Sequence, residues 1–189
     1  MNNSDLYSLA ASLVAQNRYV EALGIYERLA EDGDVRCDLY VAKLLFDGIG
    51  VPQDRLDAMC RFRRVAETGV PDGMFYFASA LSVQGEDQEA FKWYQRAAAK
   101  YYSPALFRLG NCYLEGIGIE KNKKLGFSCL EEAARSGHVI AMGQLARRYL
   151  RGENGIMMLP RGIKLLILAA LKAWRHARRD DPFAEDLMI

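Results

Sequence analysis

Residues 103–152 read SPALFRLGNCYLEGIGIEKNKKLGFSCLEEAARSGHVIAMGQLARRYLRG, and this stretch decides the fold. A pattern of a small residue, Leu, Tyr and Gly occurs in it twice, each member of the second copy 36 residues after its counterpart. The two copies are Ala105, Leu109, Tyr113 and Gly116, and Ala141, Leu145, Tyr149 and Gly152. A fixed period of this size predicts a stack of structural repeats, each built from a pair of helices.

Small residues extend the same frame over the rest of the chain. Near the end of each second helix lies a pair of apolar residues ending in Ala, and a small residue precedes each pair by seven positions. The pairs are Leu29–Ala30, Val65–Ala66, Ala97–Ala98, Ala133–Ala134 and Ala169–Ala170, and the preceding residues are Ala22, Ala58, Ala90, Gly126 and Gly162. Small residues in register let neighbouring helices approach closely, so the pattern predicts five helical hairpins.

The sequence therefore predicts one all-α solenoid of five hairpins over residues 1–181, followed by a tail, 182–189. The repeats are expected at about 4–33, 34–69, 70–102, 103–137 and 138–179. The first helix of each repeat (the A helix) is expected near 4–16, 36–47, 72–84, 104–115 and 139–151. The second (the B helix) is expected near 19–31, 55–68, 87–100, 123–136 and 161–177. Gly, Pro, Ser and Asp at the repeat boundaries supply the helix stop and start signals.

Two of the turns between A and B helices share a glycine motif, Gly48-Ile49-Gly50 and Gly116-Ile117-Gly118. Such a motif could bind phosphate, but a third glycine is missing, no strand precedes it, and it recurs in register with the repeats. We interpret it as a structural turn in which Gly supplies a positive φ and the apolar residues pack back on the helices.

Residues 109–137, LGNCYLEGIGIEKNKKLGFSCLEEAARSG, resemble the Sel-1-like repeat, a relative of the tetratricopeptide repeat. The resemblance covers the whole chain at the level of repeats, and in the fifth repeat Asn154 replaces the second turn glycine. It implies an α/α right-handed superhelix that serves as an adaptor or scaffold in protein complexes. It implies neither catalytic activity nor a cofactor.

Composition and motifs narrow the classes of function. The chain is 51% apolar and 26% charged with a net charge of +1, an ordinary globular composition without a global pull toward nucleic acid or anionic lipid. The N-terminus does not resemble a signal peptide, and Lys164 and Lys172 interrupt the longest apolar run, so we expect a soluble, cytoplasmic protein. We expect the adaptor that the resemblance implies to be bacterial.

Candidate chemistry is sparse. The four cysteines, Cys37, Cys60, Cys112 and Cys129, do not recur in register, so we expect reduced thiols rather than disulfides within repeats. The two histidines, His138 and His176, lie apart without a Cys-x-x-Cys motif, so no metal site is expected. No acyl-transfer motif occurs, and we expect no enzyme.

The face of the A helices is the first candidate binding surface. In stacked hairpins of this kind, residues one before, two after and three after the buried Leu109 position, and those one turn further on, should line a concave groove. They are Tyr40, Lys43, Leu44, Asp47, Tyr76, Ser79, Ala80, Arg108, Asn111, Cys112, Glu115, Gln144, Arg147, Arg148 and Arg151. The groove grades from aromatic to basic, which favours an acidic protein segment as its ligand. The alternative is an ordinary solvated helix face.

The last helix is the second candidate. Ile167 and Leu168 stand where the other B helices carry charged or amide side chains, and Leu171 and Trp174 extend the apolar side. A terminal repeat normally needs a polar cap, so something should cover this helix. The tail at 182–189, a protein partner, a second copy forming a homodimer, or a membrane surface could do so.

The sequence thus predicts a non-catalytic adaptor or regulator that binds a protein through the A-helix groove, the apolar last helix, or both. The alternative is binding of nucleic acid or an anionic membrane surface by the basic C-terminal repeat, where Arg175, Arg178 and Arg179 follow Trp174. A helix C-terminus favours cations in any case, and Asp180 comes next, so neither is expected as the main ligand. The sequence does not separate an adaptor from an inhibitor or immunity role.

Overall fold

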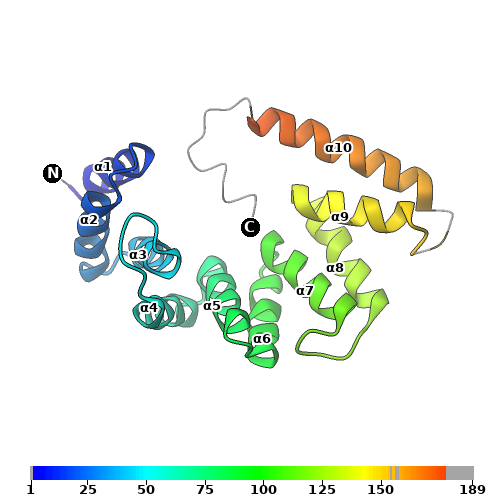
Figure 1. Cartoon of the computed structure of the whole chain (residues 1–189), viewed down its shortest axis with the longest axis horizontal. Coiled ribbons are helices and arrows are strands. Elements are labelled where there is room, and N and C mark those ends of the chain that lie inside the picture. The colour runs from blue at the N-terminus through cyan, green and yellow to red at the C-terminus, as the bar shows by residue number, and fades with distance from the viewer. Residues whose placement is uncertain (1, 154, 156–157, 178–189) are drawn as a thin grey trace. The chain divides into compact units, whose positions relative to one another are not determined.

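A computed structural model of the chain describes residues 2–153, 155 and 158–177. These residues form ten α-helices and contain no β-strand, as the repeat period predicts (Figure 1). The helices are α1 (Asn3–Ala15), α2 (Tyr19–Glu31), α3 (Val35–Asp47), α4 (Arg55–Glu67), α5 (Pro71–Val83), α6 (Asp87–Ala98), α7 (Ser103–Glu115), α8 (Lys123–Arg135), α9 (Val139–Leu150) and α10 (Leu159–Ala177). The all-α repeat fold is confirmed, with helix ends within a residue or two of those expected.

Two compact units divide the chain, Met1–Ala80 (unit 1) and Leu81–Ile189 (unit 2). Odd-numbered helices are the A helices and even-numbered helices are the B helices of five successive repeats. The division falls inside α5, the A helix of the third repeat. The tail at 182–189, together with Asn154, Arg178 and Arg179, lies outside the described residues.

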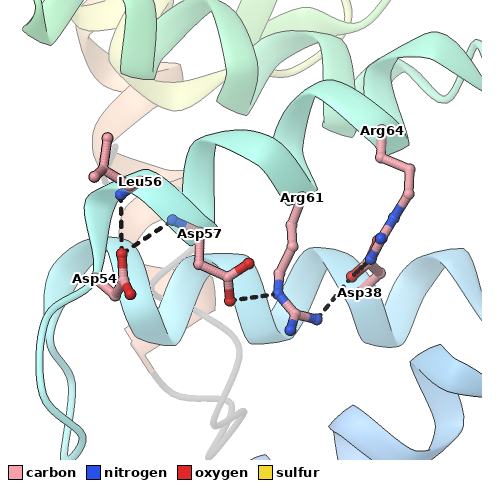
Figure 2. Close-up of polar contacts among 6 residues, drawn as sticks. All are labelled: Asp38, Asp54, Leu56, Asp57, Arg61 and Arg64. Atoms are coloured by element: carbon pink, nitrogen blue, oxygen red, sulfur yellow. Dashed lines mark hydrogen bonds and ion pairs between the residues drawn. The ribbon is translucent and has the colours of Figure 1, made fainter.

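Side chains at the helix ends explain where several helices begin and end. The Asp54 carboxylate accepts hydrogen bonds from the backbone N–H groups of Leu56 and Asp57, at 3.1 and 3.0 Å, and so caps α4 (Figure 2). Asp34 caps α3 and Asn122 caps α8 in the same way. Both A helices followed by long turns end at a glycine in the left-handed conformation.

Small residues pack the two helices of one hairpin against each other. In the fourth repeat, Gly110 of α7 meets Gly126 of α8, and a Cβ on Gly126 would lie 3.0 Å from the Gly110 carbonyl oxygen and 2.5 Å from Leu114 Cγ. The fifth repeat repeats this contact between Ala146 and Gly162. The register of small residues therefore marks the point of closest helix approach.

The second glycine of each long turn packs on the repeat before it. A Cβ on Gly50 would lie 2.4 Å from the Tyr19 ring at the start of α2, and one on Gly118 would lie 2.2 Å from the carbonyl oxygen of Asp87 at the start of α6. Both glycines have positive φ values. Val51 is buried beside this turn as expected, whereas Ile49 is exposed.

Candidate protein-binding surfaces

The A helices of unit 1 carry a row of aromatic side chains around one lysine. The Tyr40 ring stacks on Tyr26 at 5.2 Å between centroids and meets Tyr7 edge-on at 6.2 Å. The Lys43 ammonium lies 5.7 Å from the centroid of Tyr40 and 4.9 Å from that of Tyr76. Cation–π contacts therefore hold Lys43 between the A helices of the second and third repeats. Tyr40, Lys43 and Tyr76 are all half-buried.

In unit 2 the corresponding positions are polar. The Gln144 amide of α9 donates to the Asn111 side-chain oxygen of α7 at 2.7 Å. This pair has the same sequence separation as Lys43 and Tyr76, so one structural relation is aromatic in unit 1 and amide-based in unit 2. Arg148 lies half-buried beside it, 2.9 Å from a Glu153 carboxylate oxygen and 3.7 Å from one of Glu115.

The remaining arginines of this surface differ in their partners. Arg151 reaches Glu153 only at 3.9 Å. Arg147 is exposed and makes no hydrogen bond or ion pair among the described residues. Arg108 is half-buried, and its Nε is buried with no hydrogen-bond partner in that part of the chain. Burial, and after it the charge of Arg108, lowers the pKa of His138, whose Nδ1 accepts a hydrogen bond from the Ala141 backbone N–H at the start of α9.

The prediction that the residue three after the buried Leu109 position lines the groove is wrong in three repeats. Leu44, Ala80 and Cys112 are buried rather than groove-lining. A residue three after the buried Leu109 position lies within about 60° of it on a helix of 3.6 residues per turn, so it belongs to the core side. The other predicted residues, Asp47, Ser79 and Glu115 among them, are exposed or half-buried. Below, "A-face" means Asn111, Gln144, Arg108, Arg147 and Arg148 of unit 2.

The cysteines divide between core and surface. Cys37 and Cys112 are buried, Cys129 is half-buried and Cys60 is exposed. Burial raises the pKa of the Cys37 and Cys112 thiols to about 11 in each case. Both thiols are therefore protonated at neutral pH and unreactive as nucleophiles.

Helix α10 exposes a large apolar surface. Ile167, Leu168, Leu171 and Trp174, the residues expected from the sequence, are between 38% and 56% exposed. Ile163 and Leu166 of the same helix are also exposed and were missed by the sequence analysis. Their signal was present, because the equivalent residues of α8, Phe127 and Leu130, are buried core residues.

Another feature that sequence reasoning missed is an ion cluster around the buried Asp38 in unit 1 (Figure 2). Asp38 of α3 accepts from Arg64 Nε at 2.7 Å, Arg64 Nη2 at 2.6 Å and Arg61 Nη1 at 3.1 Å. Arg61 also donates to Asp57 at 2.8 Å. The cluster lies in a cleft of about 600 Å³ between α2, α3 and α4, rimmed by Glu27 and Glu31 among others.

Unit 2 has the equivalent cleft between α8, α9 and α10, with a volume of about 450 Å³. In register with Asp38, Arg61 and Arg64 stand Met142, Leu165 and Leu168. The same architectural position is therefore occupied by an ion cluster at one junction and by apolar side chains at the other. Arg161 and Lys164 of α10 lie at the rim of the apolar cleft.

Among the described residues, no group of three or more His, Cys, Asp or Glu side chains is placed to hold a metal ion. None of the described helices combines the length and the apolar character that crossing a membrane requires. The candidate sites in the described residues are therefore helix surfaces and the clefts between helices.

The family model for the Sel1 repeat matches residues 37–59, 73–102 and 103–138, which fall in the second, third and fourth repeats. The chain is a Sel1-repeat protein. The resemblance expected from residues 109–137 is therefore confirmed. A solved Sel1 repeat protein from Oxalobacter formigenes shares the fold with a TM-score of 0.82 and 24% identity, over 89% of this chain and 70% of that one.

Two curated relatives of this Sel1-repeat protein are named as regulators. Chitin synthase regulatory factor 2 of Schizosaccharomyces pombe is 30% identical over 99 residues, 52% of this chain and 19% of that protein. The exopolysaccharide production negative regulator of Rhizobium meliloti is 27% identical over 156 residues, 73% of this chain and 58% of that protein. The chain spans less than two thirds of the length of either relative. Sel1 repeats generally mediate protein–protein interaction, and the fold is typically a non-catalytic scaffold.

Proposed function

We propose that this Sel1-repeat protein is a non-catalytic interaction scaffold that binds an acidic protein segment on the A-face of unit 2. The observation that carries the proposal is the contrast between its arginines. Arg148 has two carboxylates nearby, whereas Arg108 and the exposed Arg147 form no ion pair within the described chain; the buried Nε of Arg108, like that of Arg148, has no hydrogen bond there. A guanidinium with unused donors binds a carboxylate well, because its fork matches the two carboxylate oxygens.

The neighbouring contacts support a preorganised surface. The Gln144–Asn111 hydrogen bond and the Arg148–Glu115 contact both join α7 to α9, so the side chains around Arg108 and Arg147 are fixed before a ligand arrives. A ligand that meets fixed side chains loses less conformational entropy on binding. The regulatory names of the curated relatives agree with an interaction role, and the bacterial, cytoplasmic setting expected from the sequence belongs to the same proposal.

Fluorescence anisotropy with two labelled dodecapeptides, alternating Glu–Ala and alternating Lys–Ala, tests the proposal. We expect the full chain to bind the acidic peptide and not the basic one, and the double variant Arg108→Glu, Arg147→Glu to lose about tenfold or more in affinity. The matched control is Arg28→Glu, Arg63→Glu, which makes the same change in net charge on exposed B-helix positions.

Equal loss of affinity in both double variants would mean that only net charge matters, and the proposal would be rejected. Full affinity in the Arg108, Arg147 variant would reject it as well. Binding of a 20-nucleotide DNA strand with a steep fall as salt rises would instead favour the nucleic-acid alternative, because released counterions dominate that equilibrium.

A further inference from the structure

Every junction between successive repeats is closed by an aromatic pair. A ring from the B helix of one repeat packs on a tyrosine from the A helix of the next repeat, with centroids 5.2 to 5.9 Å apart. The pairs are Tyr26 with Tyr40, Phe62 with Tyr76, Phe91 with Tyr113, and Phe127 with Tyr149. Each B-helix ring is nearly inaccessible to solvent as a result.

Helix α10 has the same two B-helix positions, but aliphatic side chains fill them and are exposed. Leu166 is in register with Tyr26 and Phe62, and Ile163 is in register with Phe91 and Phe127. Leu166 is 45% exposed and Ile163 is 54% exposed, whereas the four rings at these positions are at most 6% exposed. Ala170, in register with the buried Ala134, is exposed too. The face thus carries apolar and small residues at the positions through which α8 packs on α9, including a small residue that permits close helix approach.

The net charge of α10 indicates which kind of molecule covers this face. The helix contains no Asp or Glu, and it carries Arg161, Lys164, Lys172 and Arg175. Arg161, Lys164 and Lys172 have no carboxylate partner among the described residues, and Arg161 donates to the Met158 sulfur at 3.5 Å. A second copy of α10 would bring like charges together, which opposes a dimer through this face.

We propose that this face, made of Ile163, Leu166, Ile167, Ala170 and Trp174, binds an amphipathic helix of a partner protein in the place that the A helix of a sixth repeat would occupy. The partner helix presents an aromatic residue to Ile163 and Leu166, as Tyr149 does to Phe127, and carries a net negative charge that complements the net positive charge of α10. This inference rests on the scaffold function proposed above and adds a second surface to it. It is separate from the A-face, because α10 contributes no residue to that surface.

Three synthetic peptides test the proposal against the full chain. The first, an acidic peptide, carries residues 138–151 with Gln144→Glu, Arg147→Glu and Arg148→Glu, so the A-helix surface that packs on α8 is kept and the charge is reversed. The second is the same peptide with Tyr149→Ala, and the third is the unmodified sequence of 138–151, which is basic. Calorimetry should give binding of the acidic peptide, and affinity weaker by about tenfold or more for each of the other two.

Chain variants locate the site. Leu166→Glu should abolish binding of the acidic peptide, whereas Leu56→Glu, at an exposed leucine of α4, should leave it unchanged. Circular dichroism of both variants checks that they fold, and Ile163→Asn gives a second, milder disruption of the same face. The Arg108→Glu, Arg147→Glu variant should bind this peptide normally and lose only the Glu–Ala peptide, which separates failure of this proposal from failure of the first.

Equal affinity for the peptides with and without the tyrosine would overturn the proposal, and so would retained binding in Leu166→Glu. Light scattering and vesicle sedimentation test the other occupants. A dimer of the full chain that dissociates on Leu166→Glu would assign the face to a second copy. Sedimentation with vesicles of 30% phosphatidylserine, lost in Leu166→Glu and without binding of the acidic peptide, would assign it to a membrane surface.

Discussion

Replacing both Arg61 and Arg64 by Leu leaves the Asp38 carboxylate buried without its partners, and we expect this to be the most destabilising change in unit 1. The Asp38 side chain is 7% exposed while the two arginines cover it, and it loses three hydrogen bonds when both are replaced. Leaving a buried charge uncompensated costs about 3–5 kcal/mol in the free energy of unfolding. Arg64 itself is 65% exposed, so the cost arises from the stranded carboxylate rather than from the lost arginine.

A third substitution, Asp38→Met in the same chain, should restore most of this free energy. The three side chains would then copy Met142, Leu165 and Leu168, which fill the equivalent cleft of unit 2. Exchange of a buried ion cluster for apolar side chains of similar volume is often close to neutral, so we expect the triple variant to lie within about 1.5 kcal/mol of the wild type.

Urea unfolding followed by circular dichroism measures the free energy of unfolding of the wild type, the double variant and the triple variant. Arg63→Leu on the same helix serves as the control, because its ion pair with Glu67 is exposed on both sides and should contribute no more than about 1 kcal/mol. If adding Asp38→Met gives no recovery, the effects are simply additive and the assignment of the cost to a stranded carboxylate is refuted.

Two further predictions concern a histidine and a glycine. Burial and Arg108 lower the pKa of His138 in the folded chain below its ordinary value, so the unfolded chain takes up the proton first as pH falls. The free energy of unfolding should therefore decrease as pH falls below about 6.5, and it should level off below the folded-state pKa of His138. His138→Asn keeps a capping acceptor and should flatten that part of a urea-midpoint-against-pH curve; an unchanged slope would contradict this origin. Gly126→Ala should destabilise by about 1–3 kcal/mol through overpacking. Gly24→Ala, in open space on α2, should instead stabilise by about 0.5–1 kcal/mol, and thermal unfolding of both variants decides.

The helices could be predicted from the sequence because their packing depends on side-chain size at fixed intervals. Gly126 and Gly162 must be small wherever the two helices of a hairpin touch, and this requirement is visible in the sequence without any knowledge of the partner helix. The period therefore revealed both the hairpins and their boundaries. The error at Leu44 and Cys112 arose where angular position on the helix, rather than period, decides exposure.

The ion cluster could not be predicted in the same way. Asp38, Arg61 and Arg64 come from two helices, and their contact depends on the rotation of α3 against α4. The available signal was the carboxylate of Asp38, because the other repeats have apolar residues at this position, Met142 among them. Likewise, the sequence grouped Arg108 with Arg148 on one face, whereas their different partners are visible only in the structure.

The long turns have a consequence for how strain spreads along the chain. Gly50 locks the second repeat onto the first, and Gly118 locks the fourth onto the third, while Gly85 and Gly155 in the turns of the third and fifth repeats have open space around them. The long turns therefore add one backbone contact at two of the junctions, beyond the aromatic pair that every junction has. The fifth repeat has no such contact at Gly155, so strain at that end of the chain meets one restraint fewer than strain at the junctions closed by Gly50 and Gly118.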